Sequence, residues 1–145
     1  MNSSLKPRFL TKNEVLFVHE RQIERFGGSN GILNEGALES AISQPKQQVY
    51  GGYLHPTLEA QTSAYLFYIN KAHAFVDGNK RTSIAAAEFF LKKNGCYLKI
   101  STSLAYTTTL AVANNELDRD YLTDIIQRHM EPLSSHPHLR RRYLN

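Results

Sequence analysis

Start and stop signals for α-helices recur along almost the whole chain, and they leave little room for another class of fold. The stretch from Thr11 to Glu14 has the Ser/Thr-x-x-Glu pattern of a capping box. Gly27 and Gly28 follow, and glycine favours the conformation that ends a helix. Further helices are predicted over about 34–41, 57–72, 79–93, 102–114 and 118–130. We therefore predict an all-α domain of about six helices.

The apolar spacing predicts which helical faces enter the core. In the first and last helices the residues expected to face inward are Val15, Val18, Ile23, Phe26, Tyr121, Leu122, Ile125 and Ile126. The helix over 57–72 is apolar on most sides, so we expect it to be central. The helix over 79–93 has a face of small residues that should allow close helix packing. His19 is expected at the surface or half-buried.

Two segments interrupt the helical pattern. Residues 45–56 combine β-branched and aromatic residues with a Gly-Gly pair, which predicts a loop or a short hairpin. Residues 131–145 carry Arg140, Arg141 and Arg142 against Glu131, and we expect a basic, mobile C-terminal tail there. The predicted organisation is a domain over residues 1–130 followed by this tail.

Composition narrows the class of protein. A length of 145 residues favours a single domain. No apolar run reaches the ~20 residues that a membrane-spanning helix needs, and the first residues lack a signal-peptide core. A single cysteine fits a cytoplasmic protein without disulfides. The net charge of +4 is low for a nucleic-acid-binding domain, so we expect contact with nucleic acid only indirectly.

The chemistry of the chain is concentrated in ten residues, from His73 to Thr82, between the two most apolar helices. A loop that leads into a helix directs free backbone N–H groups and the positive end of the helix dipole at whatever lies in front of it. Phosphate is the natural ligand of such a terminus. Lys80 and Arg81 would oppose the dipole of their own helix, and a bound anion would offset that cost.

Each residue type in this stretch has a function if a nucleoside triphosphate binds there. Gly78 allows a tight turn, and Asn79 offers an amide donor. The N–H groups of residues 79–82, ending at Thr82, would complete the phosphate site. Arg81 can bind phosphate oxygens through two donors at once, and Lys80 adds a second cation.

The remaining residues of the stretch supply a metal ligand and a base. Asp77 would repel a bare phosphate, so we expect it to hold Mg²⁺. Phe75 is expected to anchor the loop in the core, and His73 can take a proton near neutral pH. The alternative interpretation is a helix-surface contact or a lone metal pair between His73 and Asp77, beside solvated cations.

The pattern His-x-Phe-x-Asp-Gly-Asn-Lys-Arg over residues 73–81 closely resembles the signature of the Fic/Doc family. Further segments, 25–42 and 79–95, resemble the Doc (death-on-curing) branch. The resemblance covers roughly residues 8–128 and implies a compact, all-α Fic fold. It implies ATP and Mg²⁺ as the nucleotide and metal, with His73 as the base and Asp77 as the metal ligand. It also places a flap, which aligns the target side chain, at about Val49–Leu54.

Lys80 distinguishes two branches of the family. Lysine at this position resembles the Doc branch, which implies transfer of the γ-phosphate to a threonine or serine hydroxyl of a target such as elongation factor Tu, inhibiting translation. Gly78 instead matches the branch that transfers AMP, so a protein adenylyltransferase acting on serine, threonine or tyrosine is the alternative.

The resemblance to Doc also implies a toxin that is held inactive by a separate antitoxin. The inhibitory pattern Ser/Thr-x-x-x-Glu-Gly/Asn of many Fic proteins is absent, because Gly31 precedes Glu35 by four residues at the one Glu-Gly pair. We therefore expect a partner chain to restrain the activity. A third possibility is a catalytically quiet binding module that acts through its antitoxin complex.

Overall fold

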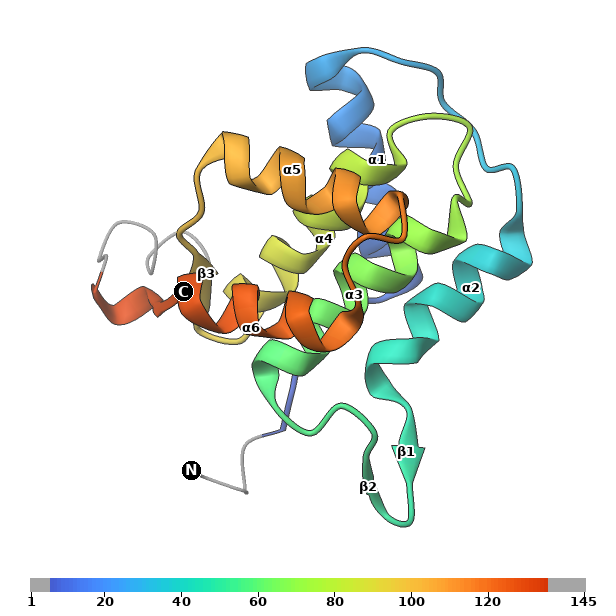
Figure 1. Ribbon diagram of the computed structural model, residues 1–145. Helices are drawn as coiled ribbons and strands as arrows, with labels where there is room; N and C mark the ends of the chain where they lie inside the picture. The colour runs from blue at the N-terminus through green and yellow to red at the C-terminus, as the bar shows by residue number, and fades with distance from the viewer. Residues whose placement is uncertain (1–5, 136–145) are drawn as a thin grey trace.

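The computed structural model describes residues 6–135. It contains six α-helices, as the capping signals predicted (Figure 1). Their bounds are α1 Lys12–Phe26, α2 Glu35–Ser43, α3 Leu58–Ala72, α4 Asn79–Lys93, α5 Thr102–Ala113 and α6 Arg119–His129. The capping box of Thr11 and Glu14 is present, with both of its hydrogen bonds formed.

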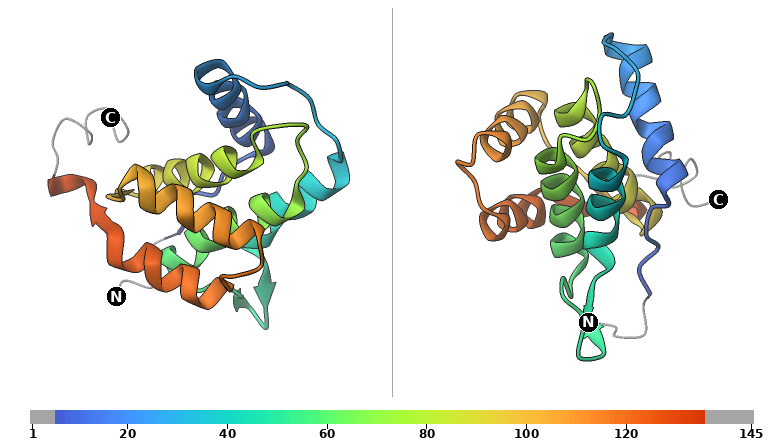
Figure 2. Two further views of the ribbon diagram at one scale, coloured as in Figure 1. Left: turned by 45° about the horizontal axis from the view of Figure 1, so that its top comes forward. Right: turned by 90° about the vertical axis from the view of Figure 1, so that its right-hand side faces the viewer.

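Helix α3 lies at the centre of the fold, as its apolar composition predicted. It packs against α2, α4, α5 and α6, while α1 covers the other side of α4 (Figures 1 and 2). Tyr65 of α3 and Phe90 of α4 are fully buried, and their rings are 4.8 Å apart. The loop that joins α3 to α4 therefore starts and ends on two fixed helices.

Two short antiparallel pairs complete the fold. Strands β1 (Gln48–Val49) and β2 (Gly52–Tyr53) form a hairpin within the segment where the sequence predicted a loop or hairpin. Strands β3 (Cys96–Leu98) and β4 (Met130–Pro132) pair across the chain, and 3-10 turns lie at Gln44–Lys46 and Leu133–Ser135.

The end of α6 differs from the sequence prediction. The helix stops at His129, and the next three residues form β4 instead of continuing the helix. Leu133 is fully buried, so residues 131–135 pack with the domain. The rest of the predicted basic tail, residues 136–145 with Arg140, Arg141 and Arg142, lies outside the described residues.

Two aromatic residues expected in the core are exposed instead. Phe26 is 60% exposed at the end of α1, and Tyr121 is 64% exposed in the first turn of α6. Both lie at a helix terminus. There the apolar face of the helix extends beyond the neighbouring elements that could bury it. Within residues 6–135, none of the helices is long and apolar enough to cross a membrane.

Candidate active site

The loop between α3 and α4 has a left-handed residue at each end. His73 ends α3 with φ 45° and ψ 47°, and Gly78 precedes α4 with φ 77°. Glycine adopts this conformation freely, whereas a side chain such as that of His73 costs about 1–2 kcal/mol there. Strained backbone of this kind concentrates at functional sites. The imidazole of His73 is exposed.

The side chain of Asn79 holds the loop by hydrogen bonds to its backbone. Its Oδ1 accepts a hydrogen bond from the N–H of Phe75, and its Nδ2 donates to the carbonyl of Phe75, both at 2.9 Å. Phe75 is fully buried, as the sequence predicted. Asn79 Nδ2 also lies 3.4 Å from Nδ1 of His73. The amide that was expected to contact phosphate therefore holds the shape of the loop.

The segment that follows α1 holds the same loop from outside. The N–H of Val76 donates to Gly31, and the N–H of Leu33 donates to Ala74, at 3.0 and 2.7 Å. Gly28 lies so close to Asp77 that an added Cβ would be 2.5 Å from its Oδ2. Two chain segments far apart in sequence thus fix the position of Asp77.

His19 is a residue that sequence reasoning missed. It is 5% exposed, which is more deeply buried than the expected surface or half-buried position, and its ring stacks on Phe75 at 3.8 Å. Its Nε2 hydrogen-bonds the backbone carbonyl of Asp77 at 2.8 Å. The available signal was its spacing of four residues from both Val15 and Ile23, which places it on the buried face of α1.

The Asp77 carboxylate is exposed and has properties that suit a magnesium ligand. It accepts hydrogen bonds from the N–H groups of Gly78 and Ser29, and these bonds lower the pKa of Asp77. Within residues 6–135, no group of three or more acidic, histidine or cysteine side chains gathers to form a complete metal site. Mg²⁺ is commonly held by one carboxylate together with substrate phosphates and water, and Asp77 fits that mode.

The first turn of α4 presents the N–H groups of Asn79, Lys80 and Arg81, which have no partner among the described residues. The Lys80 side chain is exposed. Thr82, which the sequence placed among the phosphate-binding residues, has no free N–H group of this kind. Its N–H is bonded to the carbonyl of Gly78, and its side chain is fully buried. Thr82 therefore has no group directed at a phosphate.

Arg81 connects the first turn of α4 to the end of α1. Its guanidinium donates to the carbonyls of Gln22 and Gly27, at 3.3 and 3.1 Å, and lies 5.7 Å from the centre of the Phe26 ring. A guanidinium has five N–H donors, so others remain for an anion. The exposed Phe26 ring thus helps to position the cation of the site.

Two cavities meet at the start of α4. The larger, of about 580 Å³, lies between the end of α1, the exposed face of α4 and α5, and includes Asp77 and Arg81 in its lining. The smaller, of about 110 Å³, is lined by His73 and the facing ends of α3 and α5. Asn79 and Lys80 border both cavities. Lys80 therefore stands between the candidate base and the larger space.

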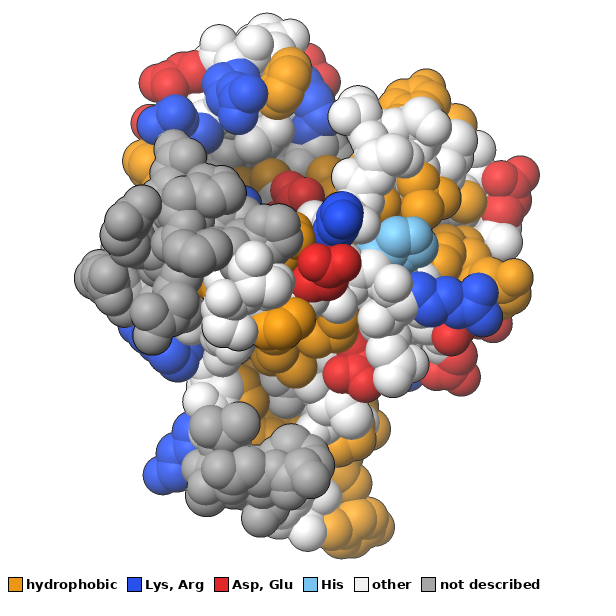
Figure 3. Space-filling view, turned by 90° about the vertical axis from the view of Figure 1, so that its left-hand side faces the viewer, with side chains coloured by type: hydrophobic (Ala, Val, Ile, Leu, Met, Phe, Trp, Pro, Cys, Tyr) orange, Lys and Arg blue, Asp and Glu red, His pale blue; other side chains and the backbone are white. Residues whose placement is uncertain are grey.

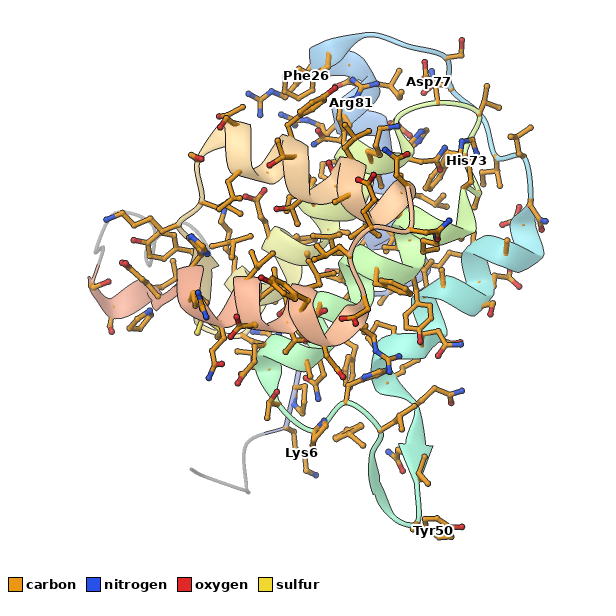
Figure 4. The ribbon with its side chains drawn as sticks, viewed as in Figure 1. Lys6, Phe26, Tyr50, His73, Asp77 and Arg81 are labelled. Carbon is orange, nitrogen blue, oxygen red and sulfur yellow. The ribbon has the colours of Figure 1, made fainter. Side chains whose placement is uncertain are left out.

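The hairpin does not lie beside these residues. Figure 4 shows Tyr50 at the end of the molecule opposite to His73, Asp77 and Arg81. The hairpin precedes α3, and the loop from His73 to Gly78 follows it, so the length of that helix separates them. The expected flap over the site at about Val49–Leu54 is therefore wrong in position, although the hairpin itself is present.

The part of the chain that contains these residues matches known proteins. The family model described as Fic/DOC family matches residues 9–91 of the chain. Over 121 residues the chain is 29% identical to the protein kinase doc of Escherichia phage P1, a match covering 83% of this chain and 94% of that protein. Over 73 residues it is 42% identical to the toxin Doc of Mycolicibacterium smegmatis, covering 50% of this chain and 56% of that protein.

Proposed function

The chain belongs to the Fic/Doc family, in its Doc branch, and from that membership we propose that it is a toxin kinase. The proposed reaction transfers the γ-phosphate of ATP to a serine or threonine hydroxyl of a target protein. The relatives are named a kinase and a toxin, which supports both parts of the proposal.

The observation that supports transfer of the γ-phosphate is the difference in size between the two cavities that border Lys80. A ligand pocket commonly has a volume of ~300–1,000 Å³. The cavity of about 580 Å³ is in that range, and the cavity of about 110 Å³ beside His73 is not. A nucleoside in the larger cavity would direct its phosphates past Lys80 towards His73. The terminal phosphate would then be the one nearest the base.

The residues of the loop divide the chemistry among them. The free N–H groups at the start of α4, with Lys80 and Arg81, bind the phosphates and neutralise their charge. Asp77 would hold Mg²⁺, which supplies additional charge neutralisation at the phosphates when bound. Most of the catalysis in phosphoryl transfer comes from such positioning and charge stabilisation.

His73 completes the reaction by taking a proton. The target hydroxyl oxygen bonds to the γ-phosphorus, the bond from that phosphorus to the β–γ bridging oxygen breaks, and ADP leaves. The hydroxyl proton passes to Nε2 of His73, which makes no hydrogen bond within the described residues. This requires the neutral ring to carry its proton on Nδ1. The contact of Asn79 with Nδ1 is long at 3.4 Å and opposes that tautomer only weakly.

AMP transfer is the second candidate, since Gly78 matches the AMP-transferring pattern. An added Cβ at Gly78 would be 3.1 Å from Ile23, and its φ is +77°, so this loop geometry favours glycine for reasons of its own. AMP transfer would place the α-phosphate next to His73 and the nucleoside outside the larger cavity. The sizes of the two cavities therefore favour phosphate transfer over AMP transfer.

The experiment that decides between them uses ATP labelled separately at the γ- and α-phosphates, with purified elongation factor Tu as the first target. A kinase transfers the γ label alone. Transfer of the α label alone would overturn the kinase proposal, and transfer of neither label under conditions where ATP binds would favour the binding module. A lysate serves as the second source of target proteins.

The biological role follows from the same branch of the family. We propose that phosphorylation of a translation factor arrests growth, and that a cognate antitoxin covers the site when growth resumes. Expression of the chain alone should stop growth, whereas co-expression of its cognate antitoxin should restore it. Growth unaffected by the active chain would contradict the toxin role.

A further inference from the structure

The larger cavity extends beyond the proposed phosphate site at the start of α4, and its lining is less polar there. Past Arg81 the lining becomes mainly apolar and comes from α4 and from the segment leading into and along α5: Ile84, Ala85, Ile100 and Ala105. Figure 3 shows basic and acidic side chains together at the top of one face of the molecule, and again side by side near its middle. A ligand in the cavity would thus have one end among cations and the other among apolar side chains.

Glu88 is the acidic residue in this apolar part of the cavity. It follows Arg81 by seven residues, so both lie on one face of α4, about 10 Å apart along the helix. The Glu88 carboxylate forms no hydrogen bond or ion pair within residues 6–135, and the charge of Lys92 acts on it only at longer range. Burial raises the pKa of Glu88. A half-buried carboxylate without a partner is costly unless a ligand satisfies it.

The rim of the cavity adds two aromatic rings from different helices. Phe26 at the end of α1 and Tyr106 in α5 both border the cavity and are 60% and 62% exposed. Flat aromatic rings are surfaces on which nucleobases stack. The cavity therefore combines cations at one end with aromatic rings, an apolar lining and a hydrogen-bond acceptor at the other.

We propose that Glu88 is a specificity residue that accepts a hydrogen bond from the exocyclic amino group of the nucleobase. The inference rests on the proposed function, because it assumes that the triphosphate lies at the start of α4. A carboxylate only accepts hydrogen bonds, so it selects a base with an N–H donor and rejects one without. Adenine and guanine both carry such an amino group, at different positions of the ring.

The test measures binding by calorimetry, with Mg²⁺ present, of four probes: ATP, GTP, purine riboside triphosphate and inorganic tripolyphosphate. Purine riboside triphosphate has the purine ring but no amino group. We expect ATP or GTP to bind about 10- to 100-fold more tightly than this analogue, the range for a hydrogen bond to a charged group. The preferred probe of the two identifies which amino group Glu88 contacts.

Variants then assign the preference to this side chain. Glu88→Leu removes the acceptor, and Glu88→Gln keeps the shape without the charge. Glu88→Leu should abolish the preference and Glu88→Gln should reduce it, while tripolyphosphate binds both variants as it binds the parent. Glu116→Leu, at an exposed position outside the cavity, is the matched control and should change nothing. Thermal melting checks that each variant is folded.

A second variant tests the cavity without altering Glu88. Ala105→Phe should fill the apolar part, weakening ATP binding while sparing tripolyphosphate. An unchanged preference in both Glu88 variants would overturn the inference, as would equal binding of ATP and tripolyphosphate. In these cases the phosphate site and the proposed kinase still stand. If neither ATP nor tripolyphosphate binds the parent, the proposed function fails and the inference with it.

Discussion

The two ends of α3 each carry a histidine, and the two side chains are in opposite environments. His55 lies just before the helix and is 4% exposed, with no hydrogen-bond partner for its buried Nε2 among residues 6–135. His73 ends the helix and is exposed. Burial, with a smaller contribution from Arg119, lowers the pKa of His55 and favours its neutral form.

In the mechanism proposed above, the same residue type serves structure at one end of the helix and chemistry at the other. The backbone around His73 is held by hydrogen bonds from Leu33 to Ala74 and from Val76 to Gly31, while its ring faces solvent. Around His55 the ring is enclosed, and the hairpin beside it projects from the fold (Figure 4). A fixed backbone with an accessible side chain is what a catalytic base requires.

The largest effect is expected from His73→Ala. Loss of a general base typically lowers the rate by about 10²- to 10⁴-fold. Transfer of labelled γ-phosphate to the target should fall by this amount, and growth arrest should disappear, with an unchanged melting temperature. His129→Ala is the control, because His129 lines neither cavity. A His73→Ala variant as toxic as the parent would remove the base from the mechanism.

Gly28→Ala should have the next largest effect, because it moves Asp77. The new Cβ would be 2.5 Å from Asp77 Oδ2, at a φ of +119° that side chains rarely adopt. We expect a loss of about 1–3 kcal/mol in the free energy of unfolding and a larger relative loss of activity. Gly51→Ala in the hairpin is matched in its positive φ but meets open space. Its activity should equal that of the parent, and a similar activity loss in both variants would contradict a role for the Gly28 contact.

Sequence reasoning recovered the helices and the loop that joins α3 to α4, but it was weaker on the surroundings of that loop. The cap residues Thr11 and Asn34 predicted helix starts because capping is a local interaction. The packing of His19 on Phe75 and the approach of Gly28 to Asp77 join segments about 50 residues apart, which no local pattern encodes. For the same reason the hairpin was expected beside the site. Its true distance depends on the direction in which α3 runs, which local sequence patterns do not encode.

The buried state of His55 predicts a pH dependence of stability. Above about pH 6.5 His55 is neutral in both the folded and the unfolded chain. Below that pH the unfolded chain takes the proton first, because the folded pKa is lowered, so the free energy of unfolding decreases as the pH falls. Denaturant titrations at pH 8 and pH 5 should show a smaller decrease for His55→Gln than for the parent. An equal decrease in the parent and in His55→Gln would show that His55 is not the titrating group.

The smallest effect is expected at the hairpin, from Tyr50→Ala. Tyr50 is fully exposed at a hairpin tip remote from His73, Asp77 and Arg81 (Figure 4). Surface changes of this kind usually shift the free energy of unfolding by less than about 0.5 kcal/mol. Phosphate transfer to the target protein should also be unchanged, with the Val49→Ala variant as the neighbouring control. Because no hairpin residue lines either of the two cavities at the start of α4, a loss of transfer with normal ATP binding would mean that the target spans both ends of the helix.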